Sequence, residues 1–111
     1  MTFAQEIVED AAALILVDEA NIAQDASEFQ LMTRFLNDYC AELFDLGVDF
    51  GYRPVVNPGD PITSPASVDW ALKVNLAKRC NSVFGLPLPP EVFQQAAESE
   101  KRLKANYIKR I

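Results

Sequence analysis

The segment 68–84 constrains the fold most, because its apolar residues have helical spacing on two adjacent faces. Two stripes recur at steps of three and four residues: Trp70, Val74, Ala77, Asn81 and Phe84, and beside them Leu72, Leu76, Cys80 and Val83. So wide an apolar face is typical of a helix surrounded by other elements. Ser67 is a candidate N-cap, and Gly85 with the prolines beyond it predicts where the helix ends. We therefore expect a central helix on which the rest of the chain packs.

Three further amphipathic helices are expected, at about 2–17, 27–46 and 89–107. Thr2 and Ser27 are candidate caps for the first two. The residues expected to face inward are Phe3, Ile7, Ala11, Leu14, Ile15, Phe29, Met32, Phe35, Leu36, Tyr39, Leu43, Leu46, Phe93, Ala96, Ala97, Glu100, Leu103 and Tyr107. The length of 111 residues suits one domain. The fold class predicted is all-α, a single domain over 1–111 resembling a four-helix bundle, with the second and third helices antiparallel.

Residues 47–66, which we call the arm, form a long interruption between the second and third helices. They include three of the four glycines and four of the seven prolines. A loop of this length in a small domain is usually functional or disordered, and this one is too apolar for a flexible linker. We expect an ordered arm that contacts another subunit, and the alternative is a loop that covers its own core. The candidate interface residues are Phe50, Tyr52, Arg53, Val55, Val56 and Ile62.

The formal charge of −6 is divided unevenly along the chain. Residues 1–72 have thirteen acidic and two basic residues, a net charge of −11, whereas residues 73–111 have eight basic and three acidic residues, a net charge of +5. One interpretation is two solvated surfaces. The other is that an acidic face of one copy contacts a basic face of the next, head to tail, in a ring. Candidate contact residues in the basic part are Lys101, Arg102, Lys104, Tyr107 and Ile108.

The composition argues against most catalytic chemistry. The chain has no histidine, which excludes histidine-based triads and zinc sites with histidine ligands. No glycine-rich phosphate loop is present. Cys40 and Cys80 lie at apolar helical positions and are interpreted as reduced core thiols. Asp38, Glu42 and Asp45 share one helix surface, which we interpret as solvated or channel-lining. We therefore expect no catalytic residue, no metal, no cofactor and no enzyme, and no apolar run is long enough to span a membrane.

The order of several short motifs is more specific than any one of them. Phe35-Leu-Asn-Asp-Tyr39 leads to Phe44-Asp-Leu-Gly47, and then come Gly51-Tyr52, Asp60-Pro61-Ile62-Thr63, Ala71-Leu-Lys-Val-Asn-Leu-Ala77 and Phe84-Gly85. This pattern, extending over about 35–108, resembles the head-completion adaptor proteins of tailed bacteriophages. Within that group it is most similar to the packaged-DNA stabilisation, or tail accessory, factors of short-tailed phages. Some members continue in a long tail that contacts the portal, and no such tail is expected here, since the chain stops at Ile111.

The resemblance implies an all-helical structural protein that forms a dodecameric ring beneath the portal. Such a ring would extend the DNA channel, retain packaged DNA and provide a platform for the tail or nozzle protein. The implied location is the head–tail interface of the virion, and the host cytoplasm during assembly. An acidic channel wall would repel the DNA backbone and let the duplex slide, and Asp38, Glu42 and Asp45 are the candidates for it.

Two alternatives from other classes remain open. The first is a small acidic helical regulatory or inhibitory protein that mimics DNA and binds a basic partner. The second is a small helical enzyme, which predicts a deep polar pocket lined by arginine and carboxylates. An exposed apolar patch on the arm would favour the adaptor over both.

Overall fold

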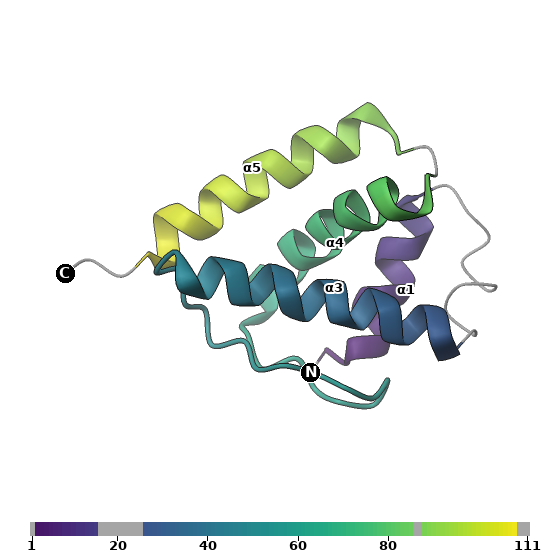
Figure 1. Cartoon of the computed structure of the whole chain (residues 1–111). Coiled ribbons are helices and arrows are strands. Elements are labelled where there is room, and N and C mark those ends of the chain that lie inside the picture. The colour runs from purple at the N-terminus through teal and green to yellow at the C-terminus, as the bar shows by residue number, and fades with distance from the viewer. Residues whose placement is uncertain (1, 16–25, 86–87, 109–111) are drawn as a thin grey trace.

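The computed structural model describes residues 2–15, 26–85 and 88–108. In this part the elements are the helices α1 (Ala4–Leu14), α3 (Ala26–Asp45), α4 (Asp69–Phe84) and α5 (Pro90–Tyr107), with a short 3-10 helix, η1 (Ala66–Val68), before α4. Figure 1 shows the four α-helices gathered into one body. The prediction of an all-α domain is confirmed. The expected last residues of the first helix, 16 and 17, lie outside the described residues. Ser27 lies within α3, one residue after its start, and its side chain, the candidate cap, is also outside what the structure describes.

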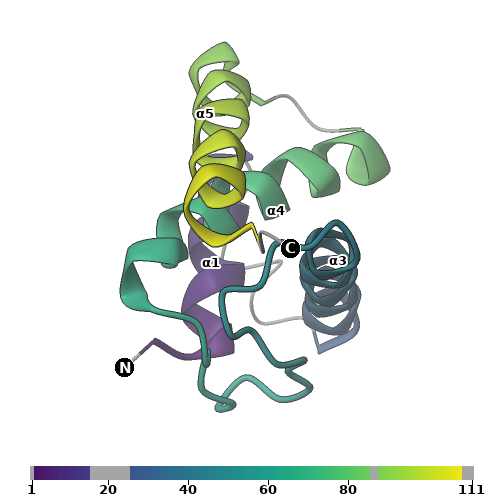
Figure 2. The same ribbon diagram turned by 90° about the vertical axis from the view of Figure 1, so that its left-hand side faces the viewer.

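Helix α4 occupies the centre of the fold, as its sequence predicts. It packs on α1, α3 and α5, and Figure 2 shows α3 and α5 on different sides of it. Leu72, Leu76 and Cys80 are fully buried. Among the described side chains of the expected stripes, Trp70 is 48% exposed and Val83 is 55% exposed, and Asn81 is half-buried. Three neighbouring helices cover only part of the circumference of α4, so the outer edge of its apolar face remains at the surface.

The inward face of α3 is predicted well up to its last residue. Leu36 and Leu43 are buried, but Leu46 is 63% exposed, because α3 ends at Asp45 and the chain turns at Gly47. Gly47 has φ +89°, a left-handed conformation that glycine adopts without strain.

The inward stripe of α5 agrees with the expected one at Ala96 and Leu103 and differs from it at Val92 and Ser99. The buried residues are Val92, Ala96, Ser99 and Leu103. Phe93 is 41% exposed and Ala97 is also exposed. These four residues follow one another at steps of four, three and four, so they lie on one line of the helix. Val92 and Ser99 are therefore buried, whereas the larger Phe93 lies to one side of the line.

Neither candidate cap, Thr2 nor Ser67, caps a helix. The Thr2 hydroxyl donates a hydrogen bond to Asp69, and Ser67 lies inside η1, with no side-chain cap on α4. The first two N–H groups of α1 instead donate to the backbone carbonyls of Asp60, at 2.9 Å, and Pro58, at 3.1 Å. The arm thus supplies the acceptors that an N-cap side chain would otherwise provide.

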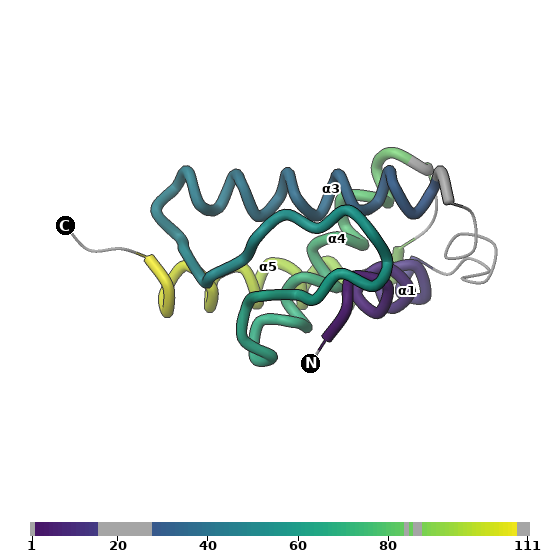
Figure 3. Tube along the Cα trace, turned by 90° about the horizontal axis from the view of Figure 1, so that it is seen from below, coloured from purple at the N-terminus to yellow at the C-terminus, as the bar shows by residue number. Residues whose placement is uncertain are grey.

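The arm is ordered by hydrogen bonds between its two limbs, the first before the turn at residues 57–60 and the second after it. Figure 3 shows it running back along α3 towards the start of α1 and then returning to α4. The Thr63 hydroxyl accepts from the Arg53 N–H at 2.8 Å and donates to the Gly51 carbonyl at 2.7 Å. At the tip, the Asp60 carboxylate accepts from the N–H groups of residues 57 and 56, and these two bonds lower the pKa of Asp60. The predicted long ordered loop between the second and third helices is confirmed.

Candidate functional site

A shallow groove lies between the outer side of α3 and the first limb of the arm. Its volume is about 280 Å³, and we call it the α3–arm groove. It is lined by Asn37, Cys40, Ala41, Phe44, Asp45, Tyr52 and Pro54. Phe44 is 58% exposed. An exposed aromatic ring beside a proline and an alanine is a surface that another chain can cover.

Two carboxylates that have no partner in the described part of the chain lie along this side of α3. Asp45 lines the groove and Asp38 lies two turns before it on the same side of the helix. Both are exposed, and neither forms an ion pair or a hydrogen bond within the described residues. Glu42 differs, because it pairs with the Arg79 guanidinium of α4. The structure therefore leaves two free acidic groups where the sequence indicated three.

Most of the apolar arm residues face the protein's own core. Phe50, Val55 and Ile62 are between 3% and 6% exposed. These three side chains were expected at a subunit interface, but in this conformation they are not available to a partner. They fit the alternative interpretation, in which the arm covers the protein's own core. Arg53 and Val56 are exposed, and Val56 is 70% exposed. The exposed apolar surface on the arm is therefore confined to its outer edge.

Tyr52 has a structural contact of its own. Its hydroxyl donates to the Asn37 side-chain oxygen at 2.6 Å, and the same oxygen accepts from the Val55 N–H at 3.1 Å. The Asn37 side-chain nitrogen donates to the Val55 carbonyl at 2.9 Å. Asn37 therefore satisfies both backbone groups of Val55 and fixes the first limb of the arm against α3. Burial raises the pKa of Tyr52, so its hydroxyl remains a donor.

The last turns of α5 form a basic surface. Lys101, Arg102 and Lys104 are exposed. The Lys104 ammonium lies 3.6 Å from Glu100 of its own helix, whereas Lys101 and Arg102 have no ion pair among the described residues. Two apolar residues follow at the end of this surface.

These two residues differ in exposure. Tyr107 is half-buried, with its ring 6.0 Å from that of Phe50 in an edge-to-face arrangement. Ile108 is 46% exposed, although its backbone pairs with Val48. Of these two residues, Ile108 is therefore the one that remains available for contact.

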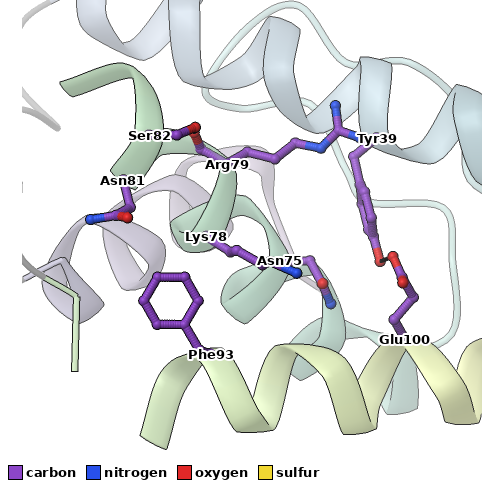
Figure 4. Close-up of a pocket in the computed structure, with 8 residues that line it drawn as sticks. All are labelled: Tyr39, Asn75, Lys78, Arg79, Asn81, Ser82, Phe93 and Glu100. Carbon is purple, nitrogen blue, oxygen red and sulfur yellow. Dashed lines mark hydrogen bonds between the residues drawn. The ribbon is translucent and has the colours of Figure 1, made fainter. Parts of the chain in front are cut away.

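A cavity of about 360 Å³, lined mainly by residues with polar groups, lies where α3, α4 and α5 meet (Figure 4). It is lined by Tyr39, Asn75, Lys78, Arg79, Asn81, Ser82, Phe93 and Glu100. The Tyr39 hydroxyl donates to Glu100 at 3.0 Å, and the Arg79 guanidinium lies 5.1 Å from the centre of the Tyr39 ring. A continuous series of polar contacts therefore joins the three helices.

This cavity has the arginine and carboxylate that the enzyme alternative requires, but that arginine and that carboxylate already have partners within the protein. Arg79 pairs with Glu42, while Glu100 accepts from Tyr39 and lies near Lys104. Burial, with a further contribution from Glu100, raises the pKa of Tyr39, so the phenol is neutral and not a base. The geometry of these groups is that of a structural network.

Two asparagines that belong to the quoted motifs have structural roles that the sequence did not predict. Asn37 fixes the arm, as described above. Asn75 is 4% exposed, and its amide donates to the Ala71 carbonyl at 2.8 Å and to the Ser99 hydroxyl at 3.1 Å, which joins α4 to α5. Asparagine has a low helix propensity. Its presence in the middle of two otherwise strong helices was the available signal for these contacts.

Cys40 and Cys80 are free and buried, as predicted. Burial raises the pKa of each thiol to about 12. Within residues 2–15, 26–85 and 88–108, no three histidine, cysteine, aspartate or glutamate side chains are grouped to hold a metal ion. None of the described helices has the length and apolar character needed to cross a membrane.

The chain matches no protein-family model and no curated protein.

Proposed function

We propose that this chain is a structural protein of a tailed-bacteriophage virion, a head-to-tail adaptor that assembles as a ring beneath the portal. In this proposal the ring extends the DNA channel, helps to retain packaged DNA and provides a platform for a tail or nozzle protein. The motif order between residues 35 and 108 is the source of the proposal.

The observation that best supports it is the arrangement of unpaired charge. Asp38 and Asp45 lie exposed on α3, and Lys101 and Arg102 lie exposed on α5. Both helices pack on α4, and Figure 2 places them on different sides of it. Two complementary surfaces on different sides of one molecule favour head-to-tail association, which closes into a ring when the rotation between copies permits.

A second supporting feature is the apolar surface at one end of the molecule. Leu46 and Ile108 are exposed, and Ile108 lies near Gly47, where α3 has just ended. The Phe44 ring belongs to the last turn of the same helix. Apolar residues gathered near one end suit a protein that stacks between a portal above and a tail component below.

The test is a mass measurement by light scattering, with the chain alone and then mixed with portal rings. We expect either a ring of about twelve chains, as the resemblance implies, or a stoichiometric complex with the portal. A chain that stays monomeric and ignores the portal would contradict the proposal. Binding of that monomer to a basic protein in place of the portal would instead support the DNA-mimic alternative.

A further inference from the structure

The α3–arm groove combines an apolar floor with an acidic edge. Ala41, Phe44 and Pro54 supply the apolar part. Asp38 and Asp45 supply two carboxylates that the described chain leaves unpaired. Apolar contact area with opposite charge at its edge is the complement of a basic amphipathic helix.

The outer face of α5 has the matching properties. Ala97, Lys101 and Ala105 follow one another at four-residue steps, so they lie on one line of the helix, and all three are exposed. Alanines on a helix surface permit close approach of a second helix, and the line ends beside Ile108. Arg102 lies next to this line and also has no ion-pair partner among the described residues.

One chain cannot bring these two surfaces together. The groove is on the outer side of α3, and the alanine line is on the side of α5 opposite the buried Ala96 and Leu103. Because α3 and α5 flank α4 (Figure 2), both surfaces face away from the core that joins them. A second copy of the chain, however, can bring its alanine line to the groove of the first copy.

We propose that the α3–arm groove of one copy binds the C-terminal half of α5 of the next copy. Asp38 and Asp45 then pair with Lys101 and Arg102 of the neighbour, and the Phe44 ring is covered by the short side chains of the alanine line. This inference rests on the proposed ring-forming function. It assigns Asp38 and Asp45 to the contact between subunits, and not to the wall of a DNA channel.

The decisive experiment uses two charge-reversed full-length chains. The first has Asp38→Lys and Asp45→Lys, so its groove and its α5 are both basic. The second has Lys101→Glu and Arg102→Glu, so both of its surfaces are acidic. Each chain alone should assemble at a concentration higher by roughly tenfold or more, because like charges meet at every junction. An equimolar mixture should recover assembly, since alternating copies make every junction complementary.

The control for the acidic residues is the variant Glu6→Lys with Glu9→Lys on α1, outside both surfaces. It makes the same change in net charge as the first reversed chain, and it should assemble like the wild type. Phe44→Ser tests the apolar floor, with Val83→Ser as its control, because the two side chains are 58% and 55% exposed. Only the Phe44 change should weaken assembly, and circular dichroism should show all variants folded.

The outcomes separate this inference from the proposed function. All assembly measurements are made with and without portal rings. If the Asp38→Lys, Asp45→Lys chain assembles at the same concentration as the wild type, the groove contact is wrong. It is also wrong if the equimolar mixture of the two reversed chains fails to assemble. Either result would leave the adaptor proposal unaffected. A wild-type chain that neither assembles nor binds the portal would overturn both.

Discussion

Replacing Asn37 with alanine should release the first limb of the arm from α3. The change removes three hydrogen bonds, two to the backbone of Val55 and one from the Tyr52 hydroxyl. At a net value of about 1 kcal/mol each, their loss costs about 3 kcal/mol, and the higher helix propensity of alanine returns about 0.5 kcal/mol. We therefore expect the free energy of unfolding to fall by about 2–3 kcal/mol, or the melting temperature by roughly 10 °C.

Two measurements together test this expectation. Urea unfolding followed by circular dichroism gives the free energy, and hydrogen exchange gives the protection of the Val55 amide, which should fall by about 50-fold for a loss of this size. Asn106→Ala is the matched control, since Asn106 is exposed on α5 and should change stability by no more than a few tenths of a kcal/mol. A loss below about 0.5 kcal/mol, with Val55 still protected, would refute the role of Asn37.

A double-mutant cycle with Tyr52→Phe adds a sharper test. Alone, this change removes the hydroxyl that donates to Asn37 and should cost about 1 kcal/mol. In the Asn37→Ala background the acceptor is already absent, so the same change should cost little. Equal costs in the two backgrounds would show that the hydroxyl and Asn37 do not interact.

Three further outcomes follow from the fold. Asn75→Ala should lower the free energy of unfolding by about 2 kcal/mol in urea unfolding, because it removes the hydrogen bond from Asn75 of α4 to the Ser99 hydroxyl of α5. An unchanged free energy would contradict a stabilising role for this bond. Gly85→Ala should cost about 1 kcal/mol, since φ is +65° but a Cβ would meet no atom within 4 Å, and a loss above about 3 kcal/mol would indicate a steric clash instead. Cys40 and Cys80 stabilise the fold as neutral thiols; because their folded pKa is raised to about 12, that stability is present below the unfolded pKa near 9 and is lost as pH rises towards 12. The urea midpoint should therefore fall between pH 8 and pH 10, and more gently when either cysteine is replaced by alanine.

The positions of the helices could be predicted from local patterns alone. Apolar spacing and the glycines at 47 and 85 are properties of neighbouring residues, and they located α3, α4 and α5 to within a few residues. The central place of α4 followed from the width of its apolar face. The buried, reduced state of Cys40 and Cys80 followed from their helical positions.

The exposure of individual side chains at the edges of these faces could not be predicted in the same way. Trp70, Leu46 and Phe93 belong to apolar stripes, yet all three are exposed, because burial depends on whether a neighbouring helix reaches them. The interface predicted for the arm depended in the same way on which elements lie next to the arm in the fold. A run of apolar residues in a loop is equally suited to a partner and to the loop's own core, and the tertiary structure places Phe50, Val55 and Ile62 in the core.

Features that depend on short separations along the chain follow from the amino-acid sequence alone: the helices, the ends of α3 and α4 at their glycines, and the division of charge between the two halves. Features that depend on residues meeting across the chain follow only from the fold. Glu42 pairs with Arg79, so only Asp38 and Asp45 lack a partner among the three carboxylates on this side of α3 in the described part of the chain. Asn37 binds the backbone of Val55, so the first limb of the arm packs against α3. The same packing placed the free charges of α3 and α5 on different sides of α4, because both helices bury their apolar faces against it.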